Sequence, residues 1–110
     1  MNLKLGKSGE KKAEKYLIKK GYNIIEKNFT CKLGEIDLIA EKDGVIVFVE
    51  VKTRKNTSYG YGFESVNSKK IEKIRKVATY FLVLKNIDKT ARFDVISIDS
   101  GKITHLTGAF

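Results

Sequence analysis

The sequence predicts an α/β protein in which a mixed central β-sheet is flanked by helices, with the elements in the order α-β-β-β-α-β-β. Two segments with helical periodicity, residues 8–20 and 68–85, enclose a set of strand-like segments. Between them, Asp43-Gly44 separates two runs rich in Val and Ile, which is a strong short-range signal for a β-hairpin. A chain of 110 residues is long enough for one domain with one core.

The first helix is expected to start at Ser8, which can cap its N-terminus, and to end before Gly21, which suits the C′ position. Ala13 and Leu17 lie on one side of this helix and face the core. Glu10 precedes Ala13 by three residues and Leu17 by seven, so its carboxylate shares that inward face.

Three strands are expected after the first helix: residues 22–28, and then the two hairpin arms, 35–42 and 45–52. A two-residue loop at Asp43-Gly44 fixes the register of the hairpin. One face of the hairpin is then wholly apolar, with Ile36, Leu38 and Ala40 opposite Val51, Val49 and Val47. A slip by one residue would set apolar faces against mixed ones, so the pattern itself supports this register.

The other face of the hairpin carries charge, because Asp37 falls opposite Glu50 and Glu35 falls opposite Lys52. Like charges that face each other destabilise an antiparallel pair, and a divalent cation would remove the conflict. Mg²⁺ is held in proteins by one or two carboxylates together with waters and phosphates. Asp37 and Glu50 are therefore candidate ligands for Mg²⁺ or Mn²⁺, with the Val51 carbonyl as a third oxygen. The alternative is an amphipathic hairpin with a solvated charged face.

The second half of the chain predicts a helix and two further strands. A polar and then glycine- and aromatic-rich loop, residues 53–63, leads to a helix at 68–85, and strands follow at 92–99 and 102–106. The connection through this helix is long enough for a parallel, right-handed crossover. We therefore expect the strand that carries Glu50 to lie at the centre of the sheet.

The charge of the chain predicts a polyanionic partner. Lys and Arg total 22 against 13 Asp and Glu, which gives a net charge of +9. Nucleic acid is the usual partner of such a domain, and an anionic membrane surface is the lesser alternative; a basic protein that its lysines merely keep soluble is a further one. The sequence has no run of about eighteen apolar residues, so no membrane span is predicted. The N-terminus lacks the apolar stretch of a signal peptide. The single cysteine, Cys31, cannot form an internal disulfide, so we expect a cytoplasmic protein.

The charged face of the hairpin suits the hydrolysis of a phosphodiester. This reaction needs an activated water and stabilisation of the charge that develops at phosphorus, and a divalent ion held by Asp37 and Glu50 would contribute to both. Lys52 would orient the water or help to deprotonate it, and would stabilise the developing charge. Glu10 could approach from the first helix to join the ion; an ordinary carboxylate favoured by the helix dipole is an equal alternative.

Several segments, in order and at suitable spacing over nearly the whole chain, resemble the small bacterial YraN family. These segments are Gly9-Glu10 with Ala13, Gly34-Glu35-Ile36-Asp37-Leu38-Ile39, Phe48-Val49-Glu50-Val51-Lys52-Thr53-Arg54, Arg92-Phe93-Asp94-Val95 and Ala109-Phe110. The resemblance implies the restriction-endonuclease-like fold with a PD-(D/E)XK site, and it extends less closely to archaeal Holliday-junction resolvases. It places Glu10, Asp37, Glu50 and Lys52 at the site positions. Ile36 stands where the name of the motif has proline, and proline is commonly absent there in this superfamily.

Basic and acidic residues around these positions are expected to assist them. Arg54 would share the side of the strand that carries Lys52 and hold a phosphate, unless it is a solvent-exposed strand end. Four lysines of the second helix would follow a DNA backbone or else form an ordinary solvated face; they are Lys69, Lys70, Lys73 and Lys76. Glu35 is expected to position Lys52 through an ion pair, and Arg92 and Asp94 to pair with each other in support of the site.

Other residue types that can carry chemistry favour structural roles. Tyr59, Tyr61 and Phe63 could stack on unpaired bases, but packing over the edge of the core is the preferred interpretation. His105 is expected to be structural, and Cys31 has no activating pattern around it that would make it a nucleophile.

The sequence thus predicts a Mg²⁺- or Mn²⁺-dependent DNA endonuclease, with selectivity for branched DNA as an open expectation and no small-molecule cofactor. The alternative is a non-catalytic nucleic-acid-binding module on the same fold, and an RNA-associated basic protein is a weaker one. Because resolvase-like enzymes pair two sites to cut two strands, a homodimer is suggested by analogy.

Overall fold

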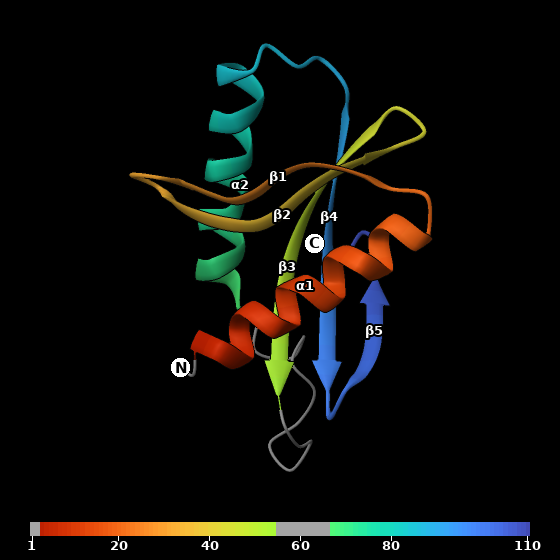
Figure 1. Ribbon diagram of the computed structural model, residues 1–110. Helices are drawn as coiled ribbons and strands as arrows, with labels where there is room; N and C mark the ends of the chain where they lie inside the picture. The colour runs from red at the N-terminus through yellow and green to blue at the C-terminus, as the bar shows by residue number, and fades with distance from the viewer. Residues whose placement is uncertain (1–2, 55–66) are drawn as a thin grey trace.

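A computed structural model describes residues 3–54 and 67–110, with side chains in the first helix from Ser8 onward (Figure 1). The elements are α1 (Leu3–Lys19), β1 (Asn23–Cys31), β2 (Gly34–Lys42), β3 (Val45–Arg54), α2 (Ser68–Leu84), β4 (Thr90–Asp99) and β5 (Lys102–Leu106). They form a five-stranded sheet in the order β1-β2-β3-β4-β5, in which β3 and β4 are parallel and the other neighbours antiparallel. The predicted element order and the central place of β3 are confirmed. The predicted contacts of Tyr59, Tyr61 and Phe63 lie outside the described residues.

Helix α1 is longer than its sequence pattern predicted. It begins at Leu3, so Ser8 lies inside the helix and the prediction that it caps the N-terminus is wrong. The residues before Ser8 include no proline, and Gly6, although a weak helix former, lies within the helix without ending it. The other end is as predicted: Gly21 has a φ of +92°, and the N–H of Tyr22 donates to the Leu17 carbonyl at 3.0 Å. This is a Schellman C-cap.

The hairpin of β2 and β3 has the predicted turn and register up to a definite point. Asp43 and Gly44 have φ angles of +51° and +78°, as a type I′ turn requires. The ladder runs from Lys42 paired with Val45 as far as Leu38 paired with Val49. Beyond Leu38, strand β2 leaves β3 and continues only with β1.

This divergence overturns one prediction about the core. Ile36 was expected on the same face as Leu38, but it packs with Phe48 and with α2, while Leu38 packs under α1. Asn28 of β1 has a φ of +52° at this level, so the extended chain bends there. The tip of the β1–β2 hairpin consequently lies against α2, as Figure 1 shows.

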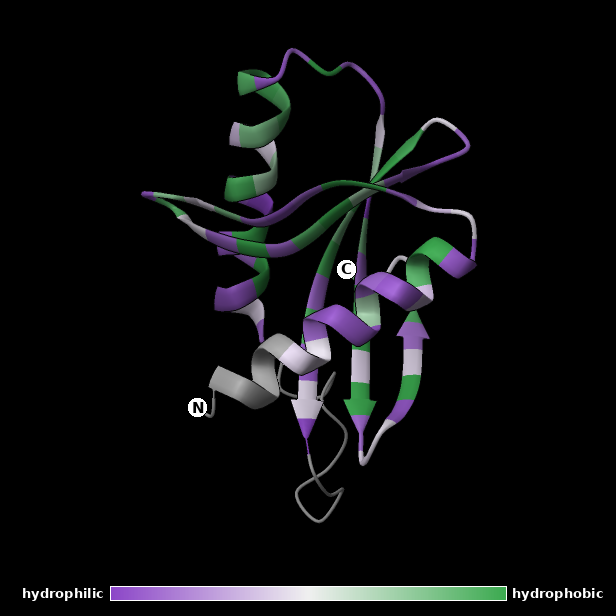
Figure 2. Ribbon diagram, in the orientation of Figure 1, coloured by the Kyte–Doolittle hydropathy of each residue, from purple (hydrophilic) through white to green (hydrophobic). Residues whose placement is uncertain are grey.

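The two helices cover opposite faces of the sheet, and each closes its own cluster of buried side chains. The α1 cluster contains Ala13, Leu17, Tyr22, Leu38, Ala40, Val47, Val49, Ile96 and Ile98. The α2 cluster contains Phe29, Ile36, Ile39, Ile46, Phe48, Ile74, Val77, Ala78 and Phe81. Strand β3 is buried on both faces in its first half and becomes hydrophilic toward its end (Figure 2). Among the described residues, no helix is long and apolar enough to cross a membrane.

Candidate active site

The candidate site forms where β2 leaves β3. The Asp37 carboxylate oxygen Oδ2 accepts a hydrogen bond from the backbone N–H of Val51 at 2.8 Å. A side chain therefore takes the place of the next ladder partner on this edge of β3. The prediction that Asp37 pairs with Glu50 in the ladder is wrong. Asp37 instead contacts Val51, the residue next to Glu50 on β3. The role of the Val51 carbonyl as a metal ligand stays a prediction.

Glu50 points from β3 to the side of α2 and meets two lysines. Its carboxylate oxygen Oε1 lies 3.3 Å from Lys52 Nζ and 2.9 Å from Lys70 Nζ. Lys52 is two residues further along β3, whereas Lys70 comes from the first turn of α2. Only 10% of the Glu50 side chain is exposed, and a carboxylate this buried needs charged partners. The structure thus brings Lys52 beside Glu50 and adds a second ammonium.

Burial shifts the pKa values of Asp37 and Lys52 in opposite directions, each toward the uncharged form. Burial, and then the negative charge of Glu50, raise the pKa of Asp37 to about 7, although the hydrogen bond from Val51 opposes the shift. Burial lowers the pKa of Lys52, and the neighbouring ammonium of Lys70 lowers it further, against the attraction of Glu50. The charged form of Asp37 is therefore disfavoured, because its surroundings do not fully compensate a negative charge there.

Close packing brings α1 over the end of β3. A Cβ atom on Gly9 would lie 2.0 Å from Thr53 Oγ1 and 3.1 Å from Thr53 Cβ, distances at which real Cβ atoms clash. Only glycine lets the helix backbone approach the strand this closely. The next residue, Glu10, is thereby held beside the site.

Glu10 interacts electrostatically with the other carboxylates of the site, and its role as a metal ligand stays a prediction. Burial raises the pKa of Glu10, as do the charges of Glu35 and Glu50, while hydrogen bonds with Asn28 and Asp37 act in the opposite direction. The carboxylates of α1, β2 and β3 therefore act on one another at this end of the sheet. Glu10 also lines a groove of about 610 Å³ between α1 and the β1–β2 hairpin, together with Asn28 and several lysines.

The predicted ion pair between Glu35 and Lys52 is wrong. Glu35 is exposed, is paired with Thr30 of β1, and accepts a hydrogen bond from the Thr30 hydroxyl at 3.2 Å. Its strand has already left β3 before reaching this residue. Lys52 instead interacts with Glu50 and has Lys70 as a neighbour.

The four lysines of α2 that were expected to follow a DNA backbone, or else to form a solvated face, do not share one exposed face. Lys69 and Lys73 are exposed, and Lys76 pairs with Glu72 at 3.4 Å on the helix surface. Lys70 turns inward to Glu50. The sequence held a signal for this, because position 70 precedes the buried Ile74, Val77 and Phe81 by four, seven and eleven residues and so lies on their stripe.

Arg54 ends β3 two residues beyond Lys52. It is half-buried and lines a groove of about 390 Å³ together with Thr53 and with Ser8 and Lys12 of α1. Its predicted role in holding a phosphate stays a prediction.

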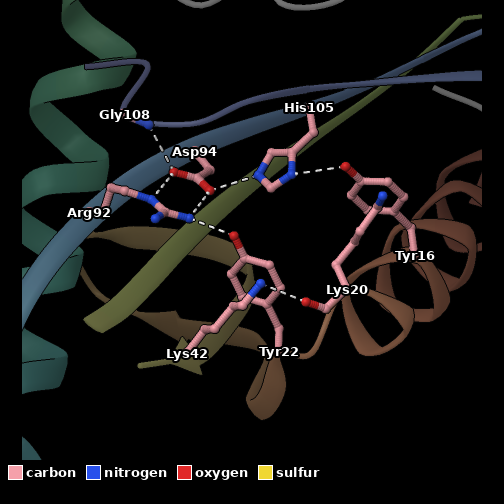
Figure 3. A network of polar contacts seen from close by, with 8 residues as sticks. All are labelled: Tyr16, Lys20, Tyr22, Lys42, Arg92, Asp94, His105 and Gly108. Atoms are coloured by element: carbon pink, nitrogen blue, oxygen red, sulfur yellow. Dashed lines mark hydrogen bonds and ion pairs between the residues drawn. The ribbon is translucent and has the colours of Figure 1, made fainter. Parts of the chain in front are cut away.

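Arg92 and Asp94 pair as predicted, but on the other face of the sheet. Arg92 donates from Nε and Nη2 to the two oxygens of Asp94, each at 2.9 Å, and from Nη2 to the Tyr22 hydroxyl at 2.7 Å (Figure 3). Asp94 is paired with Val49 of β3, which faces α1, whereas the next residue, Glu50, faces α2. This network therefore lies on the opposite face of the sheet from Glu50 and is not part of the candidate site.

His105 completes the network, in agreement with its predicted structural role. Its Nε2 lies 2.7 Å from Asp94 Oδ2 and its Nδ1 lies 3.2 Å from the Tyr16 hydroxyl, while the Gly108 N–H donates to Asp94 Oδ1 at 3.0 Å (Figure 3). Burial would raise the pKa of Asp94, but the hydrogen bonds from His105, Arg92 and Gly108 outweigh it and lower the pKa. This contact was not predicted from the sequence. A two-residue turn at 100–101 sets the β4–β5 register and makes positions 94 and 105 diagonal neighbours, so the signal was present.

The donor set of the site fits a small, hard divalent cation. The described part of the chain has no group of three or more His, Cys, Asp and Glu side chains arranged to hold a metal ion. Asp37 and Glu50 instead supply two carboxylates with excess negative charge at Asp37. Such a pair suits Mg²⁺ or Mn²⁺, which complete their coordination with waters and substrate phosphates, and lacks the nitrogen and sulfur donors typical of a structural zinc site.

Comparison with known proteins places the chain in a family. The family model described as "Uncharacterised protein family UPF0102" matches residues 9–98. A UPF0102 protein of Persephonella marina is 49% identical over 106 residues, which cover 96% of this chain and 91% of the relative. One from Clostridioides difficile is 46% identical, over 99% of this chain and 98% of the relative. One from Caldicellulosiruptor bescii is 54% identical, over 89% and 85%. In agreement with the YraN-like motifs of its sequence, the chain belongs to the UPF0102 family.

Proposed function

We propose that this protein is a divalent-metal-dependent endonuclease that hydrolyses phosphodiester bonds in DNA. One observation carries the proposal: Asp37, Glu50 and Lys52 converge on one end of β3, at the point where β2 leaves it. The α-β-β-β-α-β-β order with these residues on the second and third strands supports assignment to the restriction-endonuclease-like fold and the PD-(D/E)XK superfamily.

Each residue of the site has a chemical role in this proposal. Asp37 and Glu50 hold the cation, and Glu10 adds to the negative charge that attracts it. A divalent ion supplies charge for the phosphoryl oxygens and acidifies a water molecule. Lys52 orients the attacking water and stabilises the negative charge that develops at phosphorus. Arg54, further along the same strand, holds a neighbouring phosphate.

The surface around the site supports a polyanionic substrate. The net charge of the chain is +9 even though four carboxylates act on one another at the site. The groove beside Glu10 is lined by four lysines, Lys11, Lys12, Lys15 and Lys27, and by Glu14, which pairs with Lys27 at 3.7 Å. A basic surface around an acidic centre attracts DNA and leaves a local place for a cation.

A cleavage assay tests the proposal. Supercoiled plasmid, linear duplex, flapped DNA and four-way junctions are incubated with the wild type in Mg²⁺ or Mn²⁺, and with Asp37→Asn and Lys52→Ala. We expect cleavage that requires the ion and falls by at least about a hundredfold in both variants. Asp43→Asn, a change in the exposed hairpin turn, is the matched control and should cleave like the wild type. Cleavage that persists undiminished in both site variants would contradict the proposal.

A second candidate is a non-catalytic nucleic-acid-binding module. It is favoured by the two lysines on Glu50, because their ammonium groups compensate this carboxylate without any metal. Isothermal titration of Mn²⁺ separates the candidates: binding heat that is lost in Asp37→Asn supports the endonuclease. No heat, even with DNA present, supports the binding module.

A further inference from the structure

Lys70 is the residue of the site that the proposed chemistry does not yet use. It stands in the first turn of α2, where its backbone N–H donates to the capping Asn67 side chain at 3.0 Å. The cap fixes the main chain of Lys70, and its side chain reaches across to Glu50 of β3. Two ammonium groups, those of Lys52 and Lys70, thus lie on a single carboxylate oxygen.

A cation bound by Glu50 would compete with these ammonium groups, because cations held by one carboxylate oxygen repel each other. Lys70 is the one that can give way. Its side chain is 36% exposed, compared with 21% for Lys52, and it belongs to a separate element, whereas Lys52 is fixed to the strand of Glu50. Lysine has a long, flexible stem that can carry its charge to a second partner nearby.

We propose that Lys70 exchanges partners: its ammonium holds Glu50 when no metal ion is bound, and contacts a substrate phosphate when an ion takes its place. This inference rests on the proposed endonuclease function. The displaced ammonium remains at the N-terminal turn of α2, an end of a helix that itself favours anions. Lys70 then adds a positive charge on the side of the substrate opposite α1.

The two roles of Lys70 predict that loss of its charge strengthens Mn²⁺ binding but slows DNA cleavage. Removal of its charge takes away a competitor and leaves Glu50 less compensated, so Lys70→Met should bind Mn²⁺ about fivefold more tightly than the wild type in the absence of DNA. The same variant should cleave DNA at saturating Mn²⁺ at least about tenfold more slowly, because it lacks a phosphate contact. A merely structural lysine would not tighten the binding of the ion.

The experiment measures Mn²⁺ affinity by isothermal titration without DNA, and single-turnover cleavage at saturating Mn²⁺, for five proteins. The wild type and Lys70→Met are compared with Lys70→Arg, Lys69→Met and Asp37→Asn. Lys70→Arg keeps the ion pair and should bind Mn²⁺ like the wild type. Lys69→Met removes the same charge from the neighbouring exposed position. It serves as the control for Mn²⁺ affinity without DNA, where the general effect of a lost charge should stay below about twofold.

The outcomes separate the two proposals. If the wild type binds Mn²⁺ and Asp37→Asn does not, but Lys70→Met binds it no more tightly than Lys69→Met, the partner exchange is refuted and the metal site stands. Faster or unchanged cleavage by Lys70→Met refutes the phosphate contact. If neither the wild type nor Asp37→Asn binds Mn²⁺ and the wild type does not cleave DNA at saturating Mn²⁺, the proposed function itself fails, and the role of Lys70 fails with it.

Discussion

Replacement of Asp37 by asparagine should stabilise the metal-free protein at alkaline pH. The Asp37 carboxylate is held against buried surroundings and beside Glu50, and its pKa is raised to about 7. Asparagine has nearly the same shape and can still accept the hydrogen bond from the Val51 N–H. It removes the negative charge and keeps the contact that places the side chain.

The size of the effect follows from the pKa. An aspartate in the unfolded chain has a pKa of about 3.9, so between about pH 4 and pH 7 the folded state binds more protons than the unfolded state. The free energy of unfolding therefore falls as the pH rises through this window. The gap in pKa corresponds to ~4 kcal/mol at most. Because the side chain is partly exposed to solvent, we expect about half of this, roughly 2 kcal/mol, to be recovered in Asp37→Asn.

Urea and thermal unfolding in EDTA at pH 8.5 and pH 4 measure this prediction. For a chain of 110 residues the entropy of unfolding is about 0.23 kcal/mol/K, so Tm at pH 8.5 should rise by roughly 9 °C in Asp37→Asn. At pH 4 the two proteins should unfold together, because the folded Asp37 is then protonated. Asp43→Asn, in the exposed turn, should match the wild type at both values.

Addition of Mn²⁺ at pH 8.5 should reduce or reverse the difference in Tm between Asp37→Asn and the wild type, because only the wild type gains stability from binding the ion. The reasoning is refuted if Asp37→Asn is no more stable than the wild type at pH 8.5 in EDTA. That result would mean that the charge of Asp37 is already compensated within the metal-free site.

Further predictions concern the Asp94 hydrogen-bond network, the contact between α1 and β3, and the exposed lysines of α2. Asp94→Asn should lower the free energy of unfolding by about 3–5 kcal/mol at pH 7, measured in urea, because a buried carboxylate with four hydrogen bonds loses its charge. The pKa of Asp94 is lowered in the folded state, so this loss should shrink only as the pH falls below about 4. Gly9→Ala should destabilise by about 1–3 kcal/mol against Thr53, although alanine favours a helix, and Ser8→Ala is its exposed control. Lys73→Ala should reduce the salt dependence of DNA binding, the slope of log K against log salt, by about 0.9 if this exposed lysine contacts a phosphate.

The elements could be predicted from the sequence wherever a local signal determined them. The Asp43-Gly44 turn fixed the hairpin register because the φ angles of a type I′ turn suit these two residues. Gly21 likewise marked the end of α1. The start of α1 was misplaced because Ser8 is a good cap only where a helix begins, and nothing before it stops the helix.

The departures at the site have a common cause that the hairpin pattern does not contain. A regular ladder would have paired Asp37 with Glu50 and put Ile36 on the face of Leu38. The structure ends the ladder after Leu38, and the bend at Asn28 turns the tip of the hairpin toward α2. This bend depends on packing against a helix that follows more than thirty residues later in the chain, so alternation within the hairpin could not predict it.

The carboxylates of Asp94 on β4 and Asp37 on β2 are built for different purposes. Asp94 accepts four hydrogen bonds from Arg92, His105 and the Gly108 backbone, which leaves it little capacity for a cation. Within the described part of the chain, no buried side-chain nitrogen or oxygen lacks a partner. Asp37, in contrast, has a raised pKa, so its charge is not fully compensated. The fold satisfies Asp94 fully, although this residue lies beside the partner of Glu50 on the opposite face of the sheet. The incomplete compensation of Asp37 therefore does not serve stability. This asymmetry is the physical reason to propose cation binding for Asp37 and a structural role for Asp94.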